Sequence, residues 1–365
     1  MVLLRGSLRR EEVFIEAAPA RSALSTTVFG AELVRAPATV MAGGIFLLGA
    51  APFLLNFLGR PELAANTLRA GTWLLAALCA FIAVLFVLQL RSDPEVLWGW
   101  TVDHFAIGTW VAGTNVLARV IHPAHPLVGK GLTLAGWILA LLYAYWVATA
   151  IGRTTLLGRV NGIAFLTTVA LQSVVLTSEA LLEPSESVLR GLLVLNGIGL
   201  LVYAFCFSRV WTPSTLRWQI DSWAPVNNIT HGALSISVLA AETLAAKMAA
   251  PPALLLIAIQ TVWAVSACFF VTILLLEVGL VARGRNLLSF RVSNYARNFT
   301  YGMFFTCTYH GVTQFRESLM ATIATPPVLL ILAALVAAVN LWEFGRHFAR
   351  ILRPAPICQL GAESA

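Results

Sequence analysis

Charge is scarce in this sequence. Only 11% of its 365 residues are Asp, Glu, Lys or Arg, whereas soluble globular domains contain about 25%. Acidic residues are the rarer kind, 17 against 24 basic ones, and the aspartates are Asp93, Asp103 and Asp221. The basic residues form no cluster with interleaved aromatic residues, so we expect no nucleic-acid partner. This composition excludes a soluble domain with an ordinary charged surface.

Cysteines are few and occur singly, without a CxxC pair, at Cys79, Cys206, Cys268, Cys307 and Cys358. Zinc sites and disulfide frameworks need paired or clustered cysteines, so we expect neither. The two histidines of "HPAHP", residues 122–126, are too few ligands for a metal site. We also find no HExxH motif, no paired carboxylates and no nucleophile with a base. We therefore expect no metal, no cofactor and no catalytic residue, which disfavours a polytopic membrane enzyme.

Apolar residues, in contrast, are abundant. They make up 59% of the chain, and the mean hydropathy is +0.82. Ten apolar stretches approach the roughly 20 residues that a helix needs to cross the hydrocarbon. They cover residues 36–58, 68–90, 103–121, 131–151, 160–179, 188–208, 228–246, 253–281, 298–316 and 326–346. The sequence therefore predicts an all-α polytopic membrane protein with ten transmembrane helices.

The loops between these stretches differ in basic content. If the N-terminus lies in the cytosol, most of the 24 basic residues fall on the cytosolic side, as the positive-inside rule requires. Residues 1–32 lack the apolar core of a cleaved signal peptide. We expect a cytosolic tail over 1–32, a transmembrane domain over 33–348 and a cytosolic tail over 349–365. The predicted location is the inner (plasma) membrane, with several passes and both termini cytosolic.

The odd-numbered stretches are richer in hydroxyls, amides and glycine than the even-numbered ones. Polar groups in a membrane need water or protein partners, so we expect the odd helices to line an interior and the even ones to face lipid. The chain would then form five helical hairpins, each with one inner and one outer helix. No Lys or Arg lies deep within an inner stretch. The interior route is therefore expected to be neutral and lined by hydroxyls, which suits fast permeation of an anion.

Each inner stretch has a basic or titratable residue near its start, and glycine follows within two turns. The starting residues are Arg35, His104, Arg159, His231 and Arg297. Five helix N-termini on one face add five positive dipole ends, each of about half an elementary charge, which predicts an anion-attracting cytosolic mouth. The candidate pore-lining residues are Gly108, Thr109, Gly162, Gly232, Thr300 and Gly302. An alternative remains open: the arginines obey the positive-inside rule, the histidines pack in the core and the glycines serve helix contacts.

Carboxylates and one further histidine lie near the helix ends. Those at the outer ends of inner stretches are expected to pair with residues such as Lys247 or to face water: Glu179, Glu242 and Glu317. Glu277 and Glu343 lie near the cytosolic ends of outer stretches, where we expect them to snorkel or to pair with arginines. His310, within the ninth stretch, would make transport sensitive to pH.

Three segments resemble motifs of one family. They are "VMAGGI" (40–45), "APVNNITHGALSISVLAA" (224–241) and "NFTYGM" (298–303). These segments are similar to passages in the first, seventh and ninth helices of the tellurite-resistance and dicarboxylate transporter family. That family includes the slow-type anion channels of plant guard cells and their bacterial relatives. The likeness covers roughly residues 33–348.

The resemblance implies a pseudo-fivefold arrangement of hairpins around a central pore, and a homotrimer with one pore per subunit. It also implies that a phenylalanine, Phe299 in this sequence, plugs the pore. The sequence departs from the family at Thr300, where the family has proline, and at Asn227 and Asn228, which replace a tryptophan-containing segment.

These observations leave three classes of function. A channel for small anions such as chloride or nitrate fits the neutral pore, the basic mouth and the plugging phenylalanine. A proton-coupled carrier of a monoanion, for example in dicarboxylate, tellurite or sulfite efflux, fits the same fold. A polytopic membrane enzyme is the remote alternative. The expected partners are small inorganic or organic anions, the lipid bilayer and further copies of the chain.

Overall fold

The computed structural model describes residues 33–93, 102–151, 161–182, 184–287 and 292–352, and all regular secondary structure in these ranges is helical. This confirms the predicted all-α class. Eight helical segments in these ranges are long and apolar enough to cross a membrane. Two further helices, α6 and α13, coincide with the predicted stretches 103–121 and 298–316. Helix α6 is shorter than a membrane-spanning helix needs to be, and α13 is the least apolar of the long helices in the described ranges.

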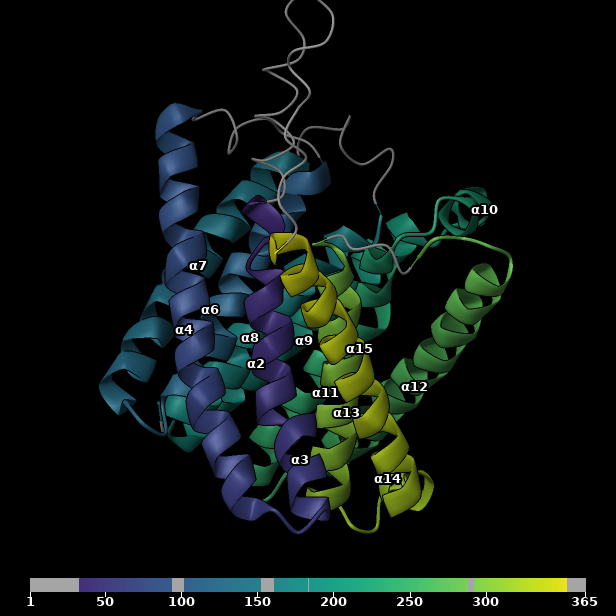
Figure 1. Cartoon of the computed structure of the whole chain (residues 1–365). Coiled ribbons are helices and arrows are strands. Elements are labelled where there is room, and N and C mark those ends of the chain that lie inside the picture. Colours follow the sequence, from purple (N-terminus) through teal and green to yellow (C-terminus); the bar gives the residue numbers. More distant parts are fainter. Residues whose placement is uncertain (1–32, 94–101, 152–160, 183, 288–291, 353–365) are drawn as a thin grey trace, which may run out of the picture.

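The helices divide into an inner and an outer set (Figure 1). The inner set consists of α2 (Ala38–Leu48), α6 (Gly108–Ile121), α8 (Leu166–Leu181), α11 (Ile229–Lys247) and α13 (Asn294–Gln314). The outer set consists of α4 (Pro61–Ser92), α7 (Pro126–Ile151), α9 (Glu186–Val210), α12 (Ala253–Ala282) and α15 (Pro326–Leu352). Short helices complete the fold: η1 (Val102–Ile107), η3 (Gly162–Phe165), η4 (Pro225–Asn228), α3 (Ala50–Phe57), α10 (Pro213–Asp221) and α14 (Leu319–Ile323).

Burial separates the two sets. Between 67% and 94% of the apolar windows of the segments that contain α2, α8 and α11 are buried, and most residues of α6 and α13 are buried as well. The outer helices bury only 11% to 28% of theirs. The outer surfaces are apolar and exposed, as lipid-facing helices require. The predicted alternation of inner and outer helices along the chain is therefore present in the structure.

The five inner helices contact one another in a closed cycle, α2–α6–α8–α11–α13 and back to α2. We call this arrangement the inner ring. Each outer helix packs against the ring at a different place: α4 on α2, α7 on α6 and α8, α9 on α8 and α11, α12 on α11 and α13, and α15 on α13 and α2. In Figure 1, α4 and α12 lie on opposite flanks of the bundle. A ring of buried helices inside a ring of lipid-facing ones is the result.

A glycine lies at every interface of the inner ring, where the backbones approach closely. A Cβ atom on each glycine would meet an atom of the neighbouring helix: Gly44 at Val116, Gly108 at Leu166, Gly162 at Val226 and Asn227, Gly232 at Thr300, and Gly302 at Ile45. Small residues let membrane helices pack at short distance without a loss of van der Waals contact. Four of these glycines were predicted to line the pore, and that prediction is wrong for them, since their missing side chains make room for a neighbouring helix.

Tight turns precede three of the inner helices, because η1, η3 and η4 lead directly into α6, α8 and α11. Amide side chains hold two of these turns together. Asn161 accepts a hydrogen bond from the Ile163 amide, and Asn227 accepts one from the Gly162 amide at 3.0 Å. Asn228 donates to the carbonyl oxygen of Pro225 at 3.0 Å. Asn227 and Asn228 therefore satisfy backbone groups at helix starts.

We predict that Gly162→Ala destabilises the fold by about 1–3 kcal/mol or more, the usual cost of overpacking. The new Cβ would lie 2.5 Å from the Val226 carbonyl oxygen and 2.6 Å from the Asn227 Cα, and backbone atoms cannot move aside as a flexible side chain can. The thermal midpoint of the detergent-solubilised protein measures the effect. Gly197→Ala is the matched control, since no heavy atom lies within 4 Å of its would-be Cβ. Equal midpoints for both variants would contradict the close packing of Gly162 against Val226 and Asn227.

Candidate ion pathway through the inner ring

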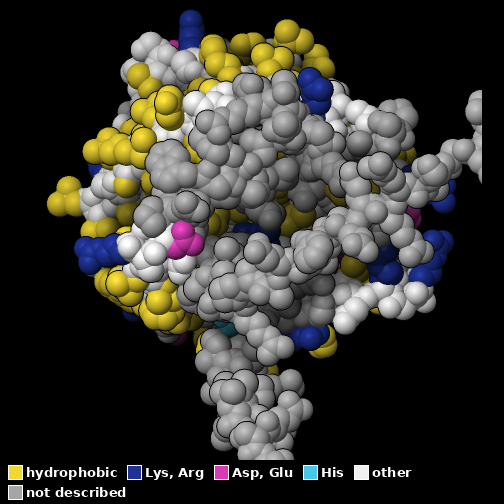
Figure 2. All heavy atoms as spheres, turned by 90° about the horizontal axis from the view of Figure 1, so that it is seen from above, with side chains coloured by type: hydrophobic (Ala, Val, Ile, Leu, Met, Phe, Trp, Pro, Cys, Tyr) yellow, Lys and Arg dark blue, Asp and Glu magenta, His cyan; other side chains and the backbone are white. Residues whose placement is uncertain are grey.

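The N-terminal ends of all five inner helices meet around one small cavity of about 30 Å³. Each helix, or the turn that leads into it, contributes to the lining, which includes Met41, Thr109, Leu166, Ile229 and Phe299. This confirms that the inner helices begin on one face of the protein. Figure 2 views this face, with basic side chains around its rim and both basic and hydrophobic atoms visible in a central hollow. We call it the N-terminal face, and the opposite one the C-terminal face.

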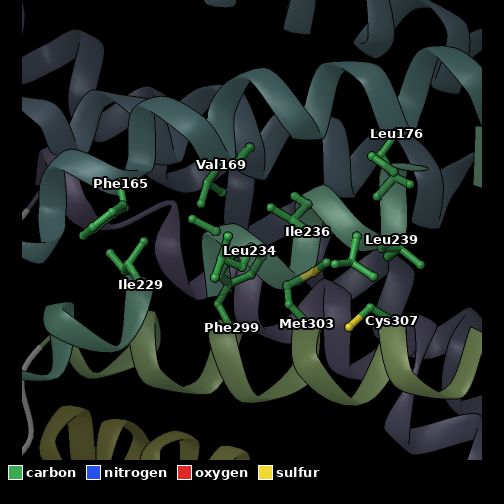
Figure 3. Packing of buried hydrophobic residues seen from close by; sticks show 14 of the residues in the cluster. Phe165, Val169, Leu176, Ile229, Leu234, Ile236, Leu239, Phe299, Met303 and Cys307 are labelled. Carbon is green, nitrogen blue, oxygen red and sulfur yellow. The ribbon is translucent and has the colours of Figure 1, made fainter. Parts of the chain in front are cut away.

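Phe299 lines this cavity from α13 and is 1% exposed. Met303 and Cys307 follow it at helical spacing and are equally buried. Figure 3 shows all three pointing from α13 toward buried side chains of α11 and α8. Because α8 is not a ring neighbour of α13, these side chains meet across the inside of the ring. The axis beyond the cavity is therefore filled by apolar side chains.

The sequence predicted that hydroxyl groups line the interior of the ring. In the structure, apolar side chains occupy the axis instead. Hydroxyls of the inner helices mostly bond to backbone carbonyl groups or to the outer helices. The bonds to outer helices and their ends join Thr230 to Trp211, which directly follows α9, Ser235 to Ser266 and Thr308 to Trp263, at 3.1, 2.9 and 3.0 Å. In the absence of water, a hydroxyl pairs with the nearest hydrogen-bond donor or acceptor of the protein, so the presence of a hydroxyl on an inner helix does not fix its direction.

The two candidate threonines differ in position. Thr109 lines the cavity, and its hydroxyl donates to the carbonyl oxygen of Ala106 at 2.7 Å. Thr300 does not line it: its methyl group packs where Gly232 has no side chain, and its hydroxyl donates to the Arg297 carbonyl oxygen at 2.9 Å. The prediction for Thr300 is therefore corrected, because one residue beyond Phe299 the helix has turned by about 100° toward α11.

Of the five residues predicted at the mouth, Arg35 lines the cavity. Arg297 instead points outward, where its guanidinium bonds Glu343 at 2.8 Å and lies 3.6 Å from Glu277. His231 is fully buried between α11, α12 and α13, beside the rings of Phe270, Tyr301 and Phe304. Both predictions are corrected, since packing partners on neighbouring helices set these directions. The side chain of His104 and all of Arg159 lie outside the described residues.

Glu277 is the hub of a buried polar network. Its carboxylate accepts hydrogen bonds from Asn228 at 2.7 Å, Trp223 at 3.1 Å and Tyr301 at 3.3 Å. Arg297 joins this hub to Glu343, which also accepts a hydrogen bond from Asn294 at 3.0 Å. The expected pairing of Glu277 and Glu343 with an arginine is confirmed. The network ties α12 and α15 to the N-terminal end of α13.

Charged side chains also gather at the C-terminal ends of the inner helices. Lys247 bonds the Glu179 carboxylate at 2.8 Å and the Glu179 carbonyl oxygen at 2.7 Å, which confirms the expected pairing of Glu179. Glu242 is fully buried, and its carboxylate lies 3.4 Å from His310. The sequence did not pair these two residues, although both lie in the last two turns of inner helices. The side chain of His310 is 26% exposed, whereas that of Glu242 is 0% exposed.

We predict that Arg297→Gln destabilises the protein by about 3–5 kcal/mol, because it leaves a buried carboxylate without its counter-charge. Arg190→Gln is the control: it breaks an exposed pair with Glu186, worth at most about 1 kcal/mol. Chemical or thermal unfolding in detergent gives both values. A triple variant, Arg297→Met with Glu277→Gln and Glu343→Leu, should regain much of the loss, because neither of the two carboxylates that Arg297 faces is then left as an unpaired buried charge. An equal effect at positions 297 and 190 would exclude a buried ion pair.

Comparison with protein-family models gives no match to this chain, and comparison with the curated proteins gives none either.

Proposed function

We propose that this protein conducts small anions such as chloride or nitrate across a membrane, along the axis of the inner ring, and that Phe299 closes the pathway. One observation carries the proposal. A cavity at the N-terminal ends of the inner helices is lined by residues from all five of them and from the turns that lead into them, and Phe299 is one of these lining residues. A bundle whose buried helices serve only as a packed core needs no such convergence of five helix starts on one cavity.

Ten membrane crossings in a pseudo-fivefold arrangement are part of this proposal. The closed cycle of the inner helices and the placement of one outer helix against each part of it support this arrangement. The low hydropathy of α13 does not argue against a crossing, because a helix enclosed by protein need not be apolar. With 21 residues it is about 30 Å long, enough to cross the hydrocarbon.

The remaining parts of the proposal follow from the charge pattern and the resemblance. Both termini lie in the cytosol, so the N-terminal face is the cytosolic one. The homotrimer, with one pathway in each subunit, rests on the resemblance to the tellurite-resistance and dicarboxylate transporter family.

The charge at the N-terminal face favours anions. Arg35 lines the cavity, and among the described residues no carboxylate does. Five helix N-termini point toward this space and add positive partial charges of about half an elementary charge each. An anion that enters is therefore stabilised by the mouth, whereas a cation is repelled.

The closed state follows from the size and chemistry of the cavity. A volume of about 30 Å³ holds roughly one water molecule. Beyond it, Phe299, Met303 and Cys307 offer an ion no polar group in exchange for its hydration shell. A hydrated anion is thus blocked by size and by dewetting. Conduction requires the Phe299 ring to turn away from the axis.

A second candidate is a proton-coupled carrier of a monoanion, such as a hydrogen dicarboxylate, tellurite or sulfite. The buried pair of Glu242 and His310 at the C-terminal end of the ring favours it, because two adjacent titratable groups in a membrane often relay protons. A carrier gives a saturable flux that follows the pH gradient. A channel gives a current that follows the voltage.

We predict that Phe299→Ala raises the anion current through planar bilayers by about tenfold, the effect of lowering a barrier by about 1.4 kcal/mol. Phe299→Leu should give an intermediate current, since it shortens the obstruction without removing it. Chloride, nitrate, sulfite and malate are exchanged in turn to read selectivity. Phe81→Ala, which truncates an exposed ring on α4, serves as the control. Unchanged currents in a folded Phe299→Ala protein would show that Phe299 does not close the pathway.

A further inference from the structure

The outer helices α12 and α15 leave a groove between them on the outside of the bundle. Both pack on α13 but not extensively on each other, and α12 diverges from α15 toward the N-terminal face (Figure 1). The groove has a volume of about 610 Å³, and its apolar walls include Leu274, Val278 and Val281 of α12 and Leu335, Ala338 and Trp342 of α15. Both helices are long and apolar enough to cross a membrane. The groove therefore lies at membrane depth and offers an apolar surface to its occupant.

The floor of the groove is polar, and its carboxylate is already engaged. Arg297 and Tyr301 of α13 and Glu277 of α12 line this floor. Glu277 lies 3.6 Å from Arg297 and accepts hydrogen bonds at both carboxylate oxygens, one of them from Tyr301 at 3.3 Å. Glu343, the other carboxylate that binds Arg297, is 0% exposed and does not line the groove. An occupant of the groove therefore need not supply a hydrogen bond to Glu277.

Basic side chains lie at the end of each wall, at the N-terminal face. Arg283 is exposed and directly follows Ala282, the last residue of α12, which lines the groove. On the other wall, the Arg346 guanidinium lies 5.5 Å from the ring centroid of Trp342, a lining residue that is 50% exposed. Tryptophan is enriched at the level of the lipid headgroups. Basic pockets between membrane helices at that level bind anionic headgroups.

We propose that this groove binds one anionic phospholipid, with an acyl chain between α12 and α15 and the phosphate between Arg283 and Arg346. The chain gains van der Waals contact with both walls, contact that the flat outer surface of a single helix does not provide. The arginines donate charge-assisted hydrogen bonds to the phosphate oxygens. A zwitterionic phospholipid brings the same chain but also a positive charge, so the site ranks anionic lipids above it. This inference depends on the membrane-spanning helices and not on the conduction of anions.

The charge at the rim favours a lipid over a second copy of the chain. Copies in one membrane share one orientation, so a neighbouring outer helix would bring its own end at the N-terminal face to this rim. That end carries an arginine in α4 and in α9, Arg91 and Arg209. It would meet Arg283 and Arg346 as like charges, which repel each other. An anionic headgroup brings the opposite charge.

Headgroup recognition is tested by native mass spectrometry of the full-length protein in detergent at fixed ionic strength. The probes are phosphatidylglycerol and phosphatidylcholine with identical acyl chains, and the wild type should bind phosphatidylglycerol at the lower concentration. Arg283→Gln with Arg346→Gln should raise the half-saturating phosphatidylglycerol concentration by about 30-fold, which corresponds to about 1 kcal/mol for each arginine. The control, Arg190→Gln with Arg209→Gln on α9, removes the same charge, including an arginine that lies 5.4 Å from the Phe205 ring centroid. A phosphatidylglycerol preference that survives at positions 283 and 346 overturns the proposal.

Occupation of the groove by the acyl chain is tested with Ala338→Trp. The indole ring would fill the space of the chain, so half-saturation by either lipid should need about tenfold more lipid. Ala144→Trp, on the exposed surface of α7, should match the wild type. If Ala338→Trp leaves lipid binding unchanged and instead separates the copies of an oligomer, a second copy covers the groove and the proposal is wrong. Equal affinity of the wild type for both lipids also overturns it, without the need for any variant to fold.

Discussion

The close approach of the five inner helices is the constraint on which the rest of the structure depends. At each interface of the ring a glycine leaves room for an atom of the next helix. The contacts form a cycle, so a side chain that widened one interface would shift the helices at the others. The cavity at the N-terminal face is lined from all five helices, and its size is set by the same spacing. Glycines that line no pathway therefore still determine how wide it is.

The second constraint is the lack of water in the hydrocarbon, which obliges every polar group to find a partner in the protein. Hydroxyl groups of the inner helices find such partners in backbone carbonyl groups or in side chains of outer helices, as Thr308 does with Trp263. Arg297 finds its partners in Glu277 and Glu343, and so attaches two outer helices to the ring. Polar side chains are thereby drawn away from the axis, which remains apolar around Phe299.

Hydropathy predicted the positions of the helices and the alternation of buried and lipid-facing ones, because both depend on composition averaged over a helix. Side-chain direction depends on rotation by about 100° per residue, which composition does not contain. For this reason Arg297, Thr300 and His231 were assigned to the pathway, although their partners lie on neighbouring helices. The Glu343 that binds Arg297 is 46 residues away in sequence, so no local pattern reveals the pair.

The two ends of the ring differ, and α13 is the element that connects them. It carries Phe299 at the apolar cavity and His310 at the charged C-terminal end, 11 residues or about 16 Å further along the helix. A carrier that coupled protonation of His310 to movement at Phe299 would have to shift this helix. Such a shift would break the buried contacts of Arg297 and the close packing at Gly232 and Gly302. Rotation of the Phe299 side chain disturbs none of them. The packing of α13 therefore favours a gate that opens by movement of the Phe299 side chain over one that needs a shift of the whole helix.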